Sequence, residues 1–343
     1  MTVRGAPCAA TRAREAVAPV VAHNPRMPQS SPPSAPRPSW LPESLFPFES
    51  RFLEVSGCRV HYVDEGSGPP LLLLHGNPTY SFLYRDIIRR LSPRFRCVAP
   101  DYPGFGLSTA PPGYDFRPAT HSRVLEELVG RLGLSGLTVM VQDWGGPIGL
   151  GLAGRRPELF RALVIGNTWA WPVEAAPSME RFAKIMGGPI GGFLIDHLNV
   201  FVNVFIPGGM KRRKPSREVM EAYRGPFTRR ESRTPVHVFP REILASREYL
   251  AEVERNLSRL RDLPALIVWG DRDVAFRKPE LERFERLFPR RRTVLLHGAG
   301  HYIQEDAPEE IAAAIERWWT ADVERAPSPE IHAVPGHDEH APH

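Results

Sequence analysis

Short apolar runs alternate with amphipathic segments along the first half of the chain. The predicted strands, which are mostly continuous apolar runs, are Arg51–Val55, Arg59–Val63, Leu71–Leu74, Cys97–Pro100, Val139–Val141 and Arg161–Ile165. Ser56-Gly57 separates the first two and predicts a tight turn between paired strands. Residues 81–91 and 121–132 carry apolar side chains at helical spacing. Strands that alternate with helices predict a mostly parallel α/β sheet with helices on both faces.

The alternation pauses between residues 169 and 262 and then resumes. This interval shows helical patches at 179–186, 216–223 and 241–256 and no convincing strand. Strands are predicted again at Ala265–Trp269 and Thr293–Leu296, with helices at Pro279–Leu287 and Pro308–Trp319. We therefore expect a core built from residues 42–168 and 263–320. The helical insert at 169–262 is expected to form a lid, or cap, over the carboxyl ends of the strands, where open α/β sheets bind ligands.

Both ends of the chain differ in composition from the middle. Residues 1–41 are rich in Pro, Ala, Arg and Ser and predict a disordered leader. Two alternatives for this segment are an organelle transit peptide and a start codon assigned upstream of a true start at Met27. Residues 321–343 are polar and rich in Pro and His, and they predict a disordered tail.

Bulk composition excludes several classes of protein. The chain is 42% hydrophobic and 24% charged, as in ordinary globular proteins, and no apolar run approaches the ~20 residues that span a bilayer. The net charge of +5 is too weak a bias across the middle of the chain to indicate nucleic-acid binding. The three scattered cysteines fit a reducing compartment, and we expect a cytoplasmic protein. The tail histidines lack metal-ligand spacing, and no cofactor or metal is expected.

The segment VMVQDWGGPI, residues 139–148, has the pattern of a nucleophile elbow. A short apolar strand is followed by a turn, two glycines and an apolar helical segment. Asp143 stands at the position of the nucleophile. An ionised carboxylate attacks a saturated carbon that bears a good leaving group, or a strained ring, and forms a covalent ester. Asp143 is therefore the expected nucleophile.

The second step of such a reaction needs a base that activates water against the ester. His301 follows the last predicted strand and has a side-chain pKa suited to this role. The orienting acid is expected after a strand between elbow and histidine, where Asp271 and Asp273 are found in WGDRD. Asp273 lies further from the strand end and is preferred. The loop after Arg161–Ile165 offers Asn167 and no early acid.

Two uncharged donors are expected beside the nucleophile. The residue after it, Trp144, and Asn77, in the loop after Leu71–Leu74, are placed to supply backbone N–H groups. Their indole and amide side chains add N–H donors without a negative charge, suited to solvating a departing anion.

These segments together resemble the haloalkane dehalogenases of the α/β-hydrolase superfamily, from about Leu45 to Trp319. The motifs that carry the resemblance are HGNPTY (75–80), PDYPGFGLS (100–108), QDWGG (142–146), GNTW (166–169), YRGPF (223–227), WGDRD (269–273) and GHYIQED (300–306). The resemblance implies an α/β-hydrolase fold with Asp143 as nucleophile, His301 as base, Asp273 as acid, and Asn77 with Trp144 as halide clamp. This combination is similar to the third subfamily, which is close to β-lactone decarboxylases. Tyr80 departs from the pattern, because relatives commonly carry Trp there.

Hydrolytic dehalogenation of a small haloalkane is the leading functional hypothesis. An epoxide hydrolase would use the same three residues together with acids such as Tyr223 and Tyr249, and a β-lactone decarboxylase would need no halide. A hydrolase-fold binding module without activity predicts damage to a catalytic position, and none is visible. The sequence does not predict the oligomeric state.

Overall fold

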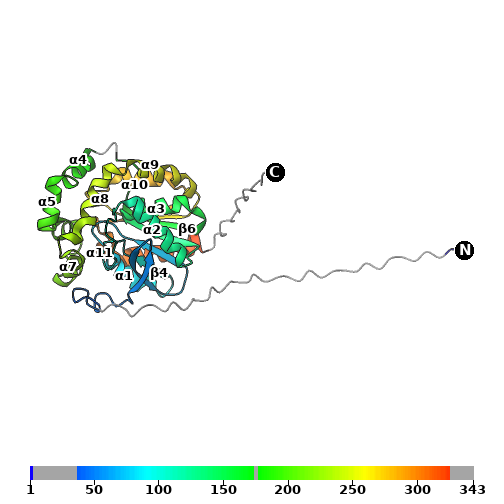
Figure 1. Cartoon of the computed structure of the whole chain (residues 1–343). Coiled ribbons are helices and arrows are strands. Elements are labelled where there is room, and N and C mark those ends of the chain that lie inside the picture. The colour runs from blue at the N-terminus through cyan, green and yellow to red at the C-terminus, as the bar shows by residue number, and fades with distance from the viewer. Residues whose placement is uncertain (3–36, 174–176, 325–343) are drawn as a thin grey trace, which may run out of the picture. The chain divides into compact units, whose positions relative to one another are not determined.

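Eight strands pair into one sheet in the computed structural model, which describes residues 1–2, 37–173 and 177–324 (Figure 1). The order across the sheet is β1-β2-β4-β3-β5-β6-β7-β8. The strands are β1 (Arg51–Val55), β2 (Cys58–Glu65), β3 (Pro70–Leu74), β4 (Arg96–Pro100), β5 (Leu137–Asp143), β6 (Phe160–Thr168), β7 (Ala265–Gly270) and β8 (Arg291–Leu296). All the strands predicted from the sequence are present.

The sheet is antiparallel at one edge and parallel elsewhere. β1 and β2 form the predicted hairpin, with Val55 opposite Cys58, and β2 pairs antiparallel with β4. The strands from β4 to β8 run parallel, so their carboxyl ends meet at one edge. Every residue of β5 before Asp143 is buried, because helices cover both faces of the central strands.

The covering helices come from all parts of the unit formed by residues 34–343. They are α1 (Arg85–Leu91), α2 (Pro118–Arg131), α3 (Gly145–Arg155), α9 (Arg247–Asn256), α10 (Lys278–Leu287) and α12 (Pro308–Trp318). α2 and α9 pack against α3, and α1 packs against α12. The helix predicted at residues 81–91 begins as a 3-10 turn, Ser81–Tyr84, and continues as α1.

The described part of the insert between β6 and β7 contains helices and the loops that join them, and no strand. Before α9, its elements are α4 (Pro177–Met186), α5 (Pro189–Leu198), the π-helical turn η3 (Phe201–Phe205), α6 (Ile206–Gly209), α7 (Arg217–Arg224) and α8 (Thr234–Ala245), with short 3-10 turns after α7, and we refer to these named elements as the cap helices. In Figure 1, α4, α5 and α7 lie together at one side of the view, clear of β4 and β6.

Three boundaries differ from those expected. The single helix predicted at 241–256 is two helices, and the second, α9, packs on α3, where the Tyr249 hydroxyl donates to the Pro147 carbonyl (2.7 Å). Leu41, expected in the leader, is fully buried, and the Trp40 ring contacts Tyr80 edge-on. A π-helical turn extends the chain after α12 as far as Val323, which is buried. Residues 3–36 and 325–343, the rest of the predicted leader and tail, lie outside the described residues.

Within the described residues, no single helix has both the length and the apolarity needed to cross a bilayer. Only α5 taken together with Phe201–Gly209 reaches those values, and this pair is bent by 77°.

A buried ion pair of the core accepts a hydrogen bond from a cap helix. Arg85 of α1 donates two hydrogen bonds to Glu305 of the short helix α11 (Ile303–Asp306), at 2.5 and 2.7 Å. The hydroxyl of Tyr223, in α7, donates to the same carboxylate. Both charged side chains are less than a tenth exposed. Each charge depends on the other, because a lone ion at this depth has no water to solvate it.

Replacing Glu305 by alanine is expected to lower the free energy of unfolding by about 3 kcal/mol, because Arg85 keeps its buried charge and is left only the more distant Asp86 carboxylate at 3.7 Å. Glu309→Ala is the matched control, since its carboxylate is 44% exposed and pairs with Arg90 at the surface. That change is expected to cost below ~1 kcal/mol. Equal losses for the two variants in urea denaturation would contradict the anchoring role of Glu305.

Candidate active site

The strand-to-helix turn after β5 holds Asp143 in a left-handed backbone conformation, with φ at +50°. Such a conformation is strained for a residue other than glycine and persists only where the surrounding structure enforces it. Gly145 allows the turn, because a Cβ there would overlap the carbonyl of Leu74 in β3. The Thr168 hydroxyl donates to the Asp143 carbonyl (2.5 Å) from the end of β6. The Asp143 side chain is thereby placed at the carboxyl edge of the sheet.

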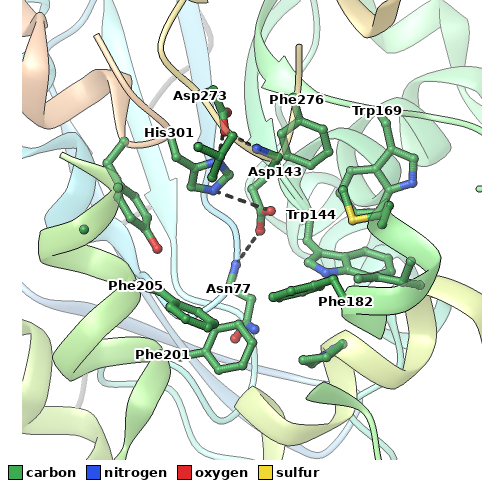
Figure 2. Close-up of a pocket in the computed structure, with 18 of the residues that line it drawn as sticks. Asn77, Asp143, Trp144, Trp169, Phe182, Phe201, Phe205, Asp273, Phe276 and His301 are labelled. Carbon is green, nitrogen blue, oxygen red and sulfur yellow. Dashed lines mark hydrogen bonds and ion pairs between the residues drawn. The ribbon is translucent and has the colours of Figure 1, made fainter. Parts of the chain in front are cut away.

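Asp143, His301 and Asp273 lie in a row at this edge (Figure 2). Asp273 comes from the loop after β7, and its Oδ2 is 3.0 Å from His301 Nδ1. His301 comes from the loop after β8, and its Nε2 is 3.7 Å from Asp143 Oδ2. The Asp273 side chain is fully buried, whereas those of Asp143 and His301 are 14% exposed. An ionised carboxylate only accepts hydrogen bonds, so His301 carries a proton on Nδ1.

The two carboxylates change the protonation of the histidine between them. Burial disfavours the imidazolium, but the charges of Asp273 and Asp143 outweigh burial and raise the pKa of His301 to about 9. Burial also raises the pKa of Asp143 above its ordinary value, against the opposing effects of His301 and two backbone N–H groups. Loss of the negative charge on Asp143 would therefore lower the pKa of His301.

Two backbone N–H groups hold the Asp143 carboxylate. The Asn77 N–H donates to Oδ1 at 2.8 Å, and the Trp144 N–H is a second donor. Gly76 makes this approach feasible, because a Cβ at that position would overlap the Asp143 side chain. These are the two N–H groups that the sequence predicted for the oxyanion hole.

The side chains of Trp144 and Asn77 line the same cavity on the side of Asp143 away from His301 (Figure 2). The indole N–H of Trp144 makes no hydrogen bond within the described residues. The Asn77 amide nitrogen lies 3.5 Å from the carbonyl oxygen of Val236, in α8, so that one of its two hydrogens faces the cap. The structure therefore brings all five predicted site residues to one cavity.

The cavity has a volume of about 520 Å³ and an apolar wall. Aromatic and aliphatic side chains from the core and the cap helices form most of this wall: Trp169, Phe182, Phe201, Phe205, Ile243 and Phe276. Asn77, Asp143, Asp273, His301 and Tyr302 are the polar side chains that contribute to it, apart from the indole N–H groups of the tryptophans. An apolar cavity with few convergent polar groups is typical of a small-molecule site.

Asn167 fixes the position of Asp273, a role that the sequence did not reveal. It lies near the end of β6 and is fully buried. Its amide nitrogen donates to Asp273 Oδ2 (3.0 Å) and to the Gly270 carbonyl (3.1 Å), while its oxygen accepts from the Gly270 N–H (2.7 Å). The only available signal was its place directly after an apolar strand run.

Gln142, the residue before Asp143 in β5, contacts the same imidazole nitrogen of His301 that faces Asp143. Its amide nitrogen lies 3.1 Å from both the Nε2 and the backbone oxygen of His301. In the neutral imidazole, whose proton is on Nδ1, Nε2 can accept one of these two amide hydrogens. Protonation of Nε2 would set two donors against each other, so Gln142 works against the carboxylates that raise the His301 pKa.

The cap also holds the histidine loop. The His301 N–H donates to the Gly209 carbonyl of α6 at 2.9 Å. The carboxylate of Asp306 accepts from the N–H groups of Gly300 (2.7 Å), Lys211 and Arg212, and so links the loop to the segment after α6. The base is consequently placed by the core and by the cap segment together.

Several residues that the sequence left open lie outside the cavity. Asp271 contacts His297 and Gly298 on the surface, which leaves Asp273 as the acid beside His301. Tyr223 and Tyr249 do not line the cavity, and their hydroxyls are committed to Glu305 and to the Pro147 carbonyl. The epoxide hydrolase hypothesis therefore loses both tyrosine acids on which it relied.

Tyr80, the departure from the family pattern, donates to the Ala222 carbonyl (2.9 Å) beneath the cap and does not line the cavity. Among the described residues, no three His, Cys, Asp or Glu side chains are arranged to hold a metal ion.

Comparison with known proteins agrees with this geometry. The family model described as the alpha/beta hydrolase fold matches residues 69–308. The chain therefore belongs to the α/β-hydrolase family, as the order of strands and the turn at Asp143 lead one to expect.

Within that family, the chain belongs with the haloalkane dehalogenases. Haloalkane dehalogenase 2 of Mycobacterium tuberculosis is 48% identical over 273 residues, which are 79% of this chain and 95% of that protein. A cis-3-alkyl-4-alkyloxetan-2-one decarboxylase of Shewanella oneidensis is 33% identical and covers 81% of this chain and 90% of that protein. The solved structure of haloalkane dehalogenase DbeA from Bradyrhizobium elkani matches 80% of this chain and 98% of its own at a TM-score of 0.74, with 29% identity.

Replacing Gln142 by methionine is expected to raise the pKa of His301 further, because the amide donor that faces Nε2 is lost while the side-chain volume is kept. Gln142→Glu is expected to raise it more, since a carboxylate would accept from the imidazolium. Titration of the His301 ring signals by NMR measures both shifts, and buried His75, with a pKa of about 4, serves as the internal reference. An unchanged His301 pKa in both variants would show that Gln142 does not act on the base.

Proposed function

We propose that this protein hydrolyses haloalkanes to an alcohol and a halide ion through an ester formed on Asp143. The observation that carries the proposal is the placement of Asp143 in an apolar cavity between two unlike partners. A histidine lies on one side, and uncharged N–H donors lie on the other. The similarity to haloalkane dehalogenases over most of the chain supports the same reaction.

In the first step, a carboxylate oxygen of Asp143 attacks the carbon that bears the halogen. The new C–O bond forms as the carbon–halogen bond breaks, and the halide leaves with the bonding electrons. The indole N–H of Trp144 and the free amide hydrogen of Asn77 stabilise the departing anion. The apolar wall excludes water, which strengthens these hydrogen bonds and leaves the carboxylate poorly solvated and reactive.

In the second step, His301 Nε2 takes a proton from water, whose oxygen attacks the carbonyl carbon of the ester. The backbone N–H groups of Asn77 and Trp144 hold the oxyanion that forms. The alcohol leaves with a proton, and Asp143 is restored with one oxygen from water. The net reaction consumes one haloalkane and one water and yields an alcohol, a halide and a proton.

Esterification itself prepares the base. In the free enzyme, Asp143 is ionised and helps to raise the His301 pKa to about 9, so the imidazolium predominates at neutral pH. The ester carries no charge, and the His301 pKa falls when one of its two carboxylate neighbours is neutralised. Neutral imidazole, the form that accepts a proton from water, therefore becomes available once the intermediate exists.

The cap helices act as a lid in this proposal. Phe182, Phe201 and Phe205 come from α4 and η3 and close the cavity opposite the sheet. They offer no polar group, so they favour the alkyl part of a substrate through burial of apolar surface.

Ring opening of a β-lactone is the second candidate. The Shewanella relative, named as a decarboxylase of alkyl-substituted oxetan-2-ones, is similar over 90% of its length. A cavity of about 520 Å³ has room for the alkyl chains of such a ring. Attack by Asp143 on the saturated ring carbon bonded to oxygen would break the strained C–O bond and release a carboxylate in place of a halide. That carboxylate would then leave as CO2, and the electrons of its C–C bond would form an alkene as the Asp143 carboxylate departs.

Asp143→Asn is expected to abolish halide release, because the amide is a poor nucleophile. His301→Gln is expected to complete alkylation and then stop. Mass spectrometry should then show the peptide that contains Asp143 heavier by the alkyl group less one hydrogen. Asp271→Asn, which changes a surface carboxylate of the same loop, is the matched control and should retain turnover. Normal turnover by either site variant would refute the mechanism.

A panel of a bromoalkane and a dialkyl β-lactone is expected to separate the two candidate reactions. For the proposed dehalogenase, halide release from the bromoalkane has a higher kcat/KM than lactone consumption. Alkene formation from the lactone without any halide release from bromoalkanes would assign the protein to the second reaction.

A further inference from the structure

Tyr302 places a phenol hydroxyl in the cavity that the proposed reaction does not use. The residue follows His301, lines the cavity and is only 3% exposed. Its hydroxyl makes no hydrogen bond within the described residues. Unlike the Tyr102 hydroxyl, this oxygen is not enclosed by the core. It therefore faces the free space of the cavity.

Four other tyrosine hydroxyls are satisfied by the protein, and that of Tyr102 is sealed in the core without a partner, whereas that of Tyr302 opens into the cavity. Tyr80, Tyr84 and Tyr249 donate to backbone carbonyls at 2.7–2.9 Å. Tyr223 donates to Glu305. Burial without a partner costs a hydroxyl about 1–3 kcal/mol, a cost that a ligand can remove by accepting the hydrogen bond.

The neighbours of Tyr302 fix the ring and keep the hydroxyl protonated. The ring meets the His301 imidazole edge-on, with centroids 4.8 Å apart. Gly209 of the cap lies against it so closely that a Cβ there would overlap the ring. Burial and the charges of Asp143 and Asp273 raise the pKa of Tyr302 well above its ordinary value. The hydroxyl therefore keeps its proton at neutral pH and is a positioned hydrogen-bond donor.

A simple haloalkane has no use for such a donor. Its halogen is met by Trp144 and Asn77, and its chain is apolar. We propose that Tyr302 forms a second polar subsite, which binds an acceptor oxygen carried by the substrate away from the reacting carbon. The substrate class is then an oxygenated alkyl compound, either a haloalkane with an ether oxygen or a β-lactone with its ring carbonyl. This inference rests on the proposed attack by Asp143 and narrows its substrate.

An oxygen scan tests the subsite. Halide release is measured for a bromoalkane and for bromoalkyl ethers of equal chain length, each with oxygen at a different methylene position, and a dialkyl β-lactone forms a second arm. Wild-type protein is expected to prefer one oxygenated compound through a lower KM. The substrate ratio is the kcat/KM for the preferred oxygenated compound divided by the kcat/KM for the bromoalkane. In Tyr302→Phe this ratio should fall by about threefold to tenfold, the effect of one neutral hydrogen bond. If the ratio falls for a bromoalkyl ether, Tyr302 binds an ether oxygen; if it falls for the β-lactone, Tyr302 binds the ring carbonyl.

Two further variants serve as a control and as a second test of the subsite. Tyr249→Phe removes a hydroxyl outside the cavity, and the substrate ratio should match that of wild type. Gly209→Ala should displace the Tyr302 ring and lower the same ratio, which tests the subsite even where Tyr302→Phe folds poorly. Ratios equal to wild type for Tyr302→Phe in both arms would overturn the subsite. Absence of halide release by wild-type protein from the bromoalkane and from all the bromoalkyl ethers would overturn the proposed function instead.

Discussion

The strained turn at Asp143 is the constraint on which the rest of the site depends. A left-handed residue at the end of β5 turns one carboxylate out of the sheet, where the N–H groups of Asn77 and Trp144 hold it. This approach leaves no room for side chains at Gly76 and Gly145. Because parallel strands end at the same edge, the loops after β7 and β8 also reach this point, and Asp273 and His301 follow from the topology.

Electrostatics then decides how the three side chains act together. Two carboxylates face one imidazole and favour the imidazolium while both are charged. In the proposed ester one of these charges is lost, which favours the neutral base. Gln142 faces the same nitrogen with a donor and opposes protonation, while Asn167 holds the distant acid in place. The cavity beyond them is apolar, and the free hydroxyl of Tyr302 is one of the few polar groups that reach it.

Local patterns in the sequence predicted most of the architecture. The apolar runs that became β3 to β7 are mostly continuous because both faces of the sheet are covered there, and such runs are readable without a structure. The elbow was also recognisable from the sequence, because its strand, its turn and its two glycines are adjacent along the chain. Motif order then indicated His301 and Asp273, because loops after successive parallel strands converge.

Tertiary structure alone decided what depends on contacts between distant segments. Gln142 and Asn167 are polar residues at strand ends, and no local pattern distinguishes a side chain that meets His301 or Asp273 from one that meets water. The break between α8 and α9 was hidden, because both helices share apolar periodicity while packing on different partners. Likewise, the roles of Tyr223, Tyr249 and Tyr302 follow from where each hydroxyl ends: two are satisfied by the protein, and the third is free in the cavity.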